Sequence, residues 1–207
     1  MINNLMERHP ALEGAKCDIE NALSALIEAY EKGGKLLLCG NGGSAADCDH
    51  IAGELLKGFM SKRPLTEEKR EEMRRLCPEL GDSTLDSLQM GLSAIALHSA
   101  AAYNTAYSND VSAELVYAQA VLSLGKSGDV LLAISTSGNS KNVLRACEVA
   151  RALGIKVIGL TGRLGGGLKD LSDVCICVPE DETYKVQELH LPVYHALCAE
   201  LEKHFFG

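Results

Sequence analysis

The chain has 207 residues, 46% of them hydrophobic, so it can bury one core of ordinary size, and we expect a single domain over residues 1–207. The formal net charge of −8 and the lack of any basic block exclude a nucleic-acid-binding surface. No apolar run is long enough to cross a membrane, and the first residues lack the apolar core of a signal peptide, which indicates the cytoplasm.

The first half of the chain begins with helical and strand patterns that follow one another closely. A helical pattern covers residues 19–32 and ends at Gly33-Gly34, and a short apolar strand follows over residues 35–39. Ser44 has the character of an N-cap for a helix that runs to about residue 57. The helix over 19–32 is apolar around most of its circumference, which predicts burial against another subunit.

A charged segment at about residues 60–92 interrupts this alternation. Residues 66–87 predict a solvated helix on an insertion, with Glu71 placed to pair with Arg74 and Arg75, and with Pro78 and Gly81 ending the helix. A lid over an active site is the alternative interpretation of this insertion.

The second half of the chain alternates again. Strands are predicted over residues 129–135, 156–162 and 174–179, and helices over 140–153 and 183–205, the last of them kinked at Pro192. Short strands alternating with helices predict an α/β fold, a doubly wound parallel-sheet three-layer sandwich with a helical N-terminal extension.

The eight cysteines favour thiols in a reducing compartment over disulfides. The chain is too long for a small domain stapled by disulfides, and no Cys-x2-Cys pair suggests structural zinc. Cys175 and Cys177 are two residues apart in a strand pattern, so both point to one face.

Gly40, Gly42 and Ala45 fit the spacing of a dinucleotide-binding fingerprint, but their context does not fit it. That fingerprint needs a second strand about 20 residues later that ends in an acid, and residues 55–68 have no strand pattern. Neither glycine-rich turn carries the Gly-Lys-Ser/Thr of a nucleotide-binding loop.

Two turns are instead typical of a site for a phosphate-sized anion. Each follows a predicted strand and precedes a helix, so backbone N–H groups and hydroxyls meet at the carboxyl edge of the sheet. The candidate phosphate-binding residues are Asn41, Gly42, Gly43, Ser44, Ser135, Thr136, Ser137 and Ser140. The alternative is that both are ordinary capped turns without a ligand.

Two helices also carry side chains suited to proton transfer or metal binding. His50 and Glu54 are four residues apart and face the same way, although a surface ion pair is the alternative. Gln187 and His195 lie about 80° apart around the last helix, so both can reach one cleft. His190 lies about 140° from His195, which favours a structural role.

The sequence Cys-Gly-Asn-Gly-Gly-Ser-x5-His-x3-Glu, the turn Ile-Ser-Thr-Ser-Gly-Asn-Ser and Val-Gln-Glu-Leu-His-x4-His together resemble the sugar isomerase (SIS) domain. More narrowly, they resemble its phosphoheptose isomerase branch, over residues 18–59 and 93–205. The resemblance implies a flavodoxin-like sandwich and a homotetramer with active sites between subunits. It also implies an isomerase that converts sedoheptulose 7-phosphate to D-glycero-D-manno-heptose 7-phosphate.

The resemblance implies roles for individual residues. Glu54 would be the catalytic base and His195 the acid, and Gln187, Asn109 and Asp110 would line the phosphorylated sugar. His50, Glu54, Gln187 and His195 would also hold one zinc ion, although one glutamate cannot be a tight ligand and a free base without rearrangement.

Two departures from the family pattern bear on which sugar is bound. The insertion at about 60–92 is longer than usual, and Tyr184 stands where an acid is common. The alternative function is a non-catalytic SIS protein that binds phosphosugars or the bacterial replication initiator. Such relatives lack parts of the His/Glu/Gln/His set that is complete here.

Overall fold

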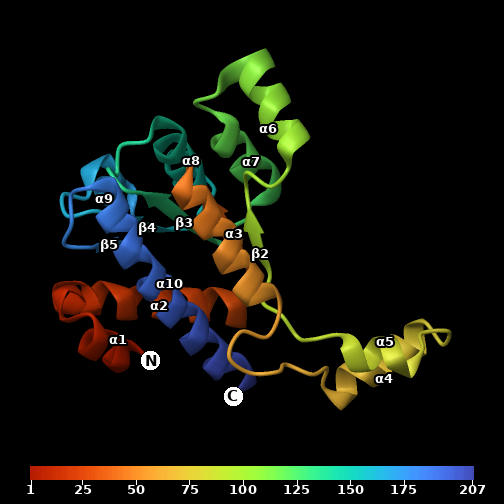
Figure 1. Ribbon diagram of the computed structural model, residues 1–207. Coiled ribbons are helices and arrows are strands. Elements are labelled where there is room, and N and C mark those ends of the chain that lie inside the picture. The colour runs from red at the N-terminus through yellow and green to blue at the C-terminus, as the bar shows by residue number, and fades with distance from the viewer.

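A computed structural model describes residues 1–207 and contains one five-stranded, all-parallel sheet (Figure 1). The strands are β1 (Leu36–Cys39), β2 (Ala94–Ala96), β3 (Val130–Ser135), β4 (Lys156–Thr161) and β5 (Val174–Cys177). Their order across the sheet, β2-β1-β3-β4-β5, is the flavodoxin-like order of doubly wound folds. The predicted α/β class and parallel sheet are therefore confirmed.

Helices cover both faces of the sheet and make three layers (Figure 1). One face carries α2 (Lys16–Glu31), α3 (Gly43–Leu56) and α10 (Thr183–Phe206), with α1 (Ile2–Arg8) and a 3-10 turn (Pro10–Ala15) as the N-terminal extension. The other face carries α7 (Val116–Leu124), α8 (Lys141–Ala152) and α9 (Gly166–Leu171). No helix is long and apolar enough to span a membrane.

The central strand β1 is buried on both faces because its side chains alternate between the two cores. Leu36 and Leu38 belong to the core under α2, α3 and α10, whereas Leu37 and Cys39 belong to the core under α7 and α8. Continuous apolar strands of this kind are typical of parallel sheets covered by helices on both sides.

The switch in winding direction lies between β1 and β3, which are neighbours in the sheet. Cys39 of β1 pairs in register with Ala133 of β3. The chain leaves β1 into α3 on one face and leaves β3 into α8 on the other. Both predicted phosphate turns therefore lie at the same carboxyl edge, on either side of the switch point.

One local expectation about the helices needs correction. The prediction that Ser44 is an N-cap is wrong: α3 begins at Gly43, Gly42 is its N-cap with a φ of 55°, and Ser44 is buried in the first turn. A positive φ suits glycine, so the N-cap falls at Gly42, two residues before Ser44. The helix α10 is continuous from Thr183 to Phe206 with Pro192 inside it, and the kink expected at Pro192 stays a prediction.

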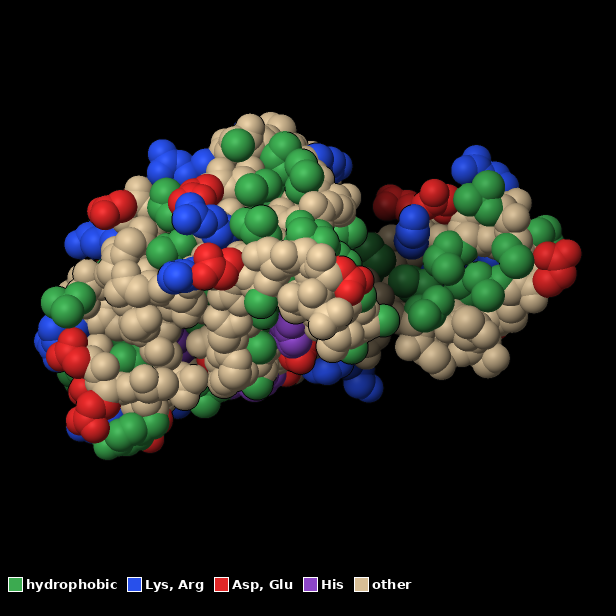
Figure 2. Space-filling model, turned by 90° about the horizontal axis from the view of Figure 1, so that it is seen from above, with side chains coloured by type: hydrophobic (Ala, Val, Ile, Leu, Met, Phe, Trp, Pro, Cys, Tyr) green, Lys and Arg blue, Asp and Glu red, His purple; other side chains and the backbone are tan.

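Residues 64–89 form an arm that projects from the body (Figure 1). Its base is an antiparallel bridge between Pro64 and Gln89, and it holds α4 (Glu67–Leu76) and α5 (Asp82–Ser87). The expected pairing of Glu71 is wrong: Glu71 makes no ion pair, and Arg74 pairs with Asp82 at 2.7 Å and with Glu67 at 3.4 Å. Figure 2 shows hydrophobic side chains gathered on one face of this arm.

Candidate active site

The turn between β1 and α3 leaves backbone donors free at the carboxyl edge. The N–H groups of Asn41 and Gly42 have no hydrogen-bond partner within the chain. Ser44 is only 4% exposed and lies behind them in the first turn of α3. Free amides at a helix start are suited to an anion because the helix dipole is positive there.

The turn between β3 and α8 adds hydroxyl groups beside the first turn. Ser135 and Ser140 share a hydrogen bond of 3.0 Å between their hydroxyls, and the Ser137 hydroxyl accepts from the Asn139 amide at 3.2 Å. Ser135 is buried, whereas Ser137 is exposed at the edge. The N–H groups of Thr136 and Ser137 have no partner within the chain.

A pair of asparagine side chains joins the two turns. The amides of Asn41 and Asn142 exchange reciprocal hydrogen bonds of 2.8 and 2.9 Å. Asn142 belongs to the first turn of α8 and was not predicted from the sequence. The two turns therefore form one continuous polar surface across the switch point.

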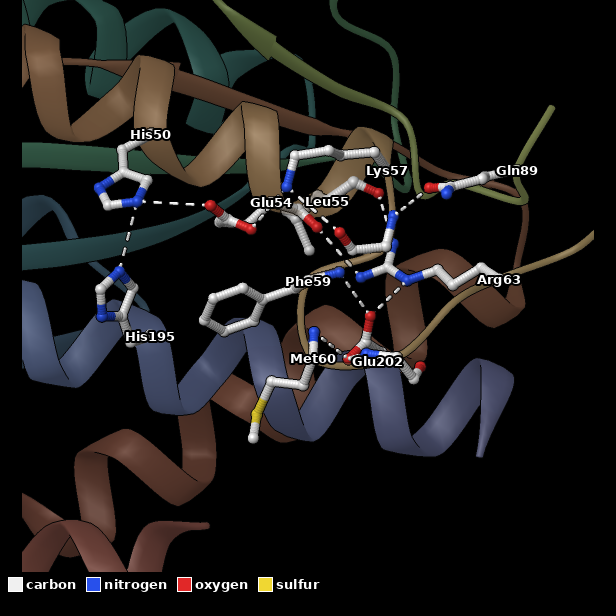
Figure 3. A network of polar contacts seen from close by, with 12 residues as sticks. His50, Glu54, Leu55, Lys57, Phe59, Met60, Arg63, Gln89, His195 and Glu202 are labelled. Atoms are coloured by element: carbon white, nitrogen blue, oxygen red, sulfur yellow. Dashed lines mark hydrogen bonds and ion pairs between the residues drawn. The ribbon is translucent and has the colours of Figure 1, made fainter. Parts of the chain in front are cut away.

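Further along α3, three side chains meet between α3 and α10 (Figure 3). His50 Nε2 lies 3.4 Å from Glu54 Oε1 and 3.4 Å from His195 Nε2. The second oxygen of Glu54, Oε2, accepts from Lys57 Nζ over 3.1 Å. Burial, followed by the nearby His50, lowers the pKa of His195, so this ring is held neutral at pH 7.

A tyrosine and an aspartate fix the orientation of His50. The Tyr194 hydroxyl donates to Asp47 Oδ1 over 3.1 Å and lies 3.1 Å from His50 Nδ1. Because Tyr194 gives its hydrogen to Asp47, its oxygen accepts from His50 Nδ1, which leaves a lone pair on His50 Nε2. That lone pair faces Glu54 and His195. The three side chains together offer several acceptor atoms, which suits a cation.

Gln187 lies away from this group. A Cβ atom at Gly43 would come within 2.3 Å of Gln187 Nε2, so the amide packs against the phosphate turn. Gln187 is about 12 Å from His195 along α10 at the regular helical rise. No group of three or more His, Cys, Asp or Glu side chains is closed into a metal site, and the ligand role of Gln187 stays a prediction.

Asn109 and Asp110 also lie apart from the other predicted site residues. They sit in a π-helical turn (Ser108–Ser112) after α6 (Ala101–Tyr107), where Asn109 Nδ2 donates to Asp110 Oδ1 over 2.9 Å. Both side chains are exposed, and their side-chain hydrogen bond is to each other. Their role in substrate binding stays a prediction.

The remaining histidines have other surroundings. His190 is fully buried without a partner for either ring nitrogen, and burial lowers its pKa to about 4. This agrees with the structural role expected for it. His98 contacts Asp49 at 2.9 Å, outside the group formed by His50, Glu54 and His195.

A model of the SIS domain matches residues 2–75 and 71–162 of the chain. The chain belongs to the SIS domain family. Within it, the chain is 43% identical over 192 residues to the phosphoheptose isomerase of Thiobacillus denitrificans, covering 91% of this chain and 84% of that one. It is 39% identical over 214 residues to that of Helicobacter pylori, covering 99% and 98% of the two chains.

A solved SIS structure supports the same placement. The phosphoheptose isomerase of Neisseria gonorrhoeae superposes with a TM-score of 0.74 at 32% identity, over 97% of this chain and 96% of that one. The chain therefore falls in the phosphoheptose isomerase branch of the SIS family. The resemblance carried by the two turns and the His/Glu and Gln/His pairs is confirmed.

Proposed function

We propose that the chain is a phosphoheptose isomerase that interconverts sedoheptulose 7-phosphate and D-glycero-D-manno-heptose 7-phosphate. The observation that carries this proposal is the 39% identity to a phosphoheptose isomerase across nearly the whole of both chains. The free amides of the two turns and the group of Glu54, His50 and His195 supply the polar contacts that the reaction requires.

The phosphate binds at the two turns. The free N–H groups of Asn41, Gly42, Thr136 and Ser137 and the exposed Ser137 hydroxyl donate to its oxygens. The chain carries a net charge of −8, so these local dipoles have to hold the dianion without a positive field from the rest of the molecule.

Glu54 and His195 carry out the proton transfers. The Glu54 carboxylate takes a proton from one of the two carbons at the end of the sugar chain and returns it to the other. His195, neutral at pH 7 because burial lowers its pKa, donates a ring N–H to the oxygen that changes between carbonyl and hydroxyl. His50 keeps its Nε2 lone pair toward both groups through Tyr194 and Asp47.

We propose one zinc ion per site, held by His50, Glu54 and His195. Gln187 would be the fourth ligand only after its side chain moves from Gly43 toward the other three, and Glu54 would have to leave the ion to act as the base. Two ligand atoms of a tetrahedral zinc lie about 3.3–3.4 Å apart. His50 Nε2 has this separation, 3.4 Å, from both Glu54 Oε1 and His195 Nε2, which supports these three residues as ligands. When bound, zinc would polarise the substrate carbonyl.

We also propose a homotetramer with sites at the subunit interfaces, in a reducing compartment such as the cytoplasm. Several large apolar side chains are exposed on the single chain, among them Leu122 at 55% and Leu191 at 40%, and their burial by a second copy supports assembly. All eight cysteines are free thiols, which supports the compartment.

The test is an isomerase assay on sedoheptulose 7-phosphate with and without a metal chelator. We expect turnover that a chelator abolishes and added Zn²⁺ restores. Turnover that persists after complete metal removal contradicts the proposed zinc site but leaves the isomerase proposal standing. Tight binding of the sugar phosphate without turnover, in the zinc-loaded protein, contradicts the isomerase and favours the phosphosugar-binding alternative.

A further inference from the structure

A buried ion pair joins the chain just beyond Glu54 to the end of α10, the helix that carries His195 (Figure 3). Arg63 Nε donates to Glu202 Oε1 over 2.7 Å. The Arg63 side chain is fully buried and the Glu202 side chain is 4% exposed. We call Arg63 and Glu202 the clamp.

Arg63 uses its other donors on the end of α3. Its Nη1 donates to the Leu55 carbonyl over 2.8 Å, and its Nη2 donates to the Glu54 carbonyl over 3.0 Å. Carbonyls in the last turn of a helix have no partner within the helix, so the guanidinium caps α3 at its C-terminus. The main chain of Glu54 is therefore held directly by Arg63.

Glu202 uses its carboxylate on the loop that follows α3. It accepts from the backbone amides of Phe59 and Met60, both at 2.8 Å, and from Ser61 at 3.0 Å. Burial alone would raise the pKa of Glu202, but these amides and Arg63 outweigh it and hold the pKa below its usual value. The carboxylate is therefore ionised and its oxygens are fully used.

The same loop reaches His195. The Phe59 amide is bound by Glu202, and the Phe59 ring lies against the His195 ring with 5.5 Å between their centroids. One side of the clamp thus holds the backbone of Glu54, and the other side holds the aromatic ring that packs on His195.

Stability alone gives a weak reason for such a pair, because replacing a buried ion pair by apolar residues of similar volume is often neutral or stabilising. The contacts of this pair converge instead on the two residues assigned to proton transfer. We infer that Arg63 and Glu202 are positioning residues that set the placement of Glu54 relative to His195. This inference rests on the proposed function, which assigns Glu54 and His195 as base and acid.

The test compares Arg63→Lys with the double variant Arg63→Met/Glu202→Gln. Lysine keeps the positive charge near Glu202 but cannot reproduce three donors in a planar fork, and the double variant leaves no unpaired buried charge. We expect kcat to fall about 10–100-fold in both, because a misplacement of about 1 Å has an effect of this size. KM should stay within about twofold, since the phosphate turns lie at the other end of α3.

Val157→Ala is the matched control for lost stability. Val157 is fully buried in β4, in the core under α7 and α8, on the face of the sheet opposite α3 and α10. It should lower Tm without lowering kcat, measured where circular dichroism shows every variant folded. The inference is overturned if the clamp variants keep kcat within about twofold of the unmodified chain. It is also overturned if kcat falls and KM rises by a similar factor.

The ring-nitrogen NMR signals of His195 provide a second measurement that does not need activity. We expect them to shift in the double variant and to stay in place in Val157→Ala. Unchanged signals in the double variant overturn the inference. If the folded, unmodified chain shows no turnover, the proposed function is contradicted. The His195 signals then still test whether the clamp positions His195.

Discussion

At the scale of single residues, Glu54 is held at three points. Its backbone carbonyl is bound by Arg63, one carboxylate oxygen faces His50 and the other accepts from Lys57. Only 14% of its side chain is exposed, so the carboxylate presents a narrow face to a ligand. Because Glu54 is held at these points, replacing one carboxylate oxygen by an amide nitrogen should leave its neighbours in place.

Glu54→Gln should therefore lower kcat by about 10²–10⁴-fold, the usual contribution of a positioned base. The amide keeps the volume of the side chain but cannot take a proton. Steady-state kinetics measures the loss, and an unchanged Tm shows that the fold is intact.

Glu72→Gln is the control for this prediction. Glu72 pairs with Lys69 three residues away on the exposed helix α4, as Glu54 pairs with Lys57, but it lies on the arm. The activity of Glu72→Gln should equal that of the unmodified chain. Turnover of Glu54→Gln within a few-fold of that value removes Glu54 from the chemistry.

Ser137→Ala should act on binding and leave the chemical step largely unchanged. A hydrogen bond to a charged oxygen is worth about 1.5–3 kcal/mol, so KM should rise about tenfold or more, with a smaller change in kcat. Ser87→Ala is the control, because the Ser87 hydroxyl bonds only to the Ser83 carbonyl within α5. Equal KM values for the two variants would place the phosphate elsewhere.

At the scale of elements, a buried carboxylate ties two strands together at the amino edge of the sheet. Asp129 accepts from the Lys35 amide at 3.0 Å and from the Lys126 amide at 2.9 Å, and it pairs with the Lys35 ammonium group. Its side chain is fully buried. The bonds fix the start of β3 beside the start of β1.

Acid should weaken this tie. Burial raises the pKa of Asp129, but the bonds from Lys35 and Lys126 outweigh it, so the folded-state pKa lies below the ordinary value of about 3.9. The stabilisation is fully present above about pH 4 and is lost as pH falls through the lower folded-state pKa. Asp129→Asn should lower Tm by about 4–8 °C at pH 7, if the bonds contribute about 2 kcal/mol.

The Tm difference between Asp129→Asn and the unmodified chain should shrink below pH 4. Asp181→Asn is the control, since Asp181 pairs with Arg163 on the surface with 61% of its side chain exposed. A Tm difference for Asp129→Asn that stays constant from pH 7 to pH 3 contradicts this account.

The elements that the sequence predicted well are those with a strong local signal. β1, β3 and β4 are continuous apolar runs, and α10 ends within one residue of its predicted end. β2 has only three residues and α5 only six, too short for a periodic pattern, and both were missed. Ser44 was wrongly predicted as the N-cap because the positive φ of Gly42, the actual N-cap of α3, has no sequence signal beyond the glycine itself.

The predicted site was limited in a different way. His50 and Glu54 share a helix turn, so their spacing alone brought them together. The bond between Arg63 and Glu202 spans 139 positions, and the Tyr194 bond to Asp47 spans 147. Only the packing of α10 along α3 creates these contacts, and no single-sequence pattern predicts them.

At the scale of the whole molecule, the arm stands apart from the body (Figure 2). Leu85 is the one side chain buried within its helices, while Leu76 is 74% exposed. Ion pairs, including Arg70 with Asp86 and Arg74 with Asp82, join α4 to α5. The arm therefore contributes little to the core of the chain that carries it.

Replacing residues 66–87 by a short Gly-Ser turn should leave the stability of the body unchanged. Pro64 and Gln89 already lie together at the base, so the new connection closes without strain. We expect Tm to change by no more than about 2 °C, as for surface changes away from the core. A large drop in Tm would show that the arm stabilises the body.

The oligomer is a separate prediction at this scale. Light scattering at micromolar concentration should give the mass of a symmetric tetramer. Within one chain, α2 buries Ile19 and Leu26 but only partly covers Leu23 and Ile27, and these two should be closed by another copy. A stable, active monomer would refute the tetramer.

The helix α3 begins at a predicted phosphate turn and carries the proposed base near its last residues. Ser44 and Glu54 are about 15 Å apart along its axis at the regular rise per residue. A helix is stiff, so α3 holds the turn and Glu54 at a fixed separation. A sugar phosphate must be long enough to span that separation to be converted. A five-carbon sugar phosphate anchored at the turns would end short of Glu54, and it should therefore occupy the site as an inhibitor without being converted.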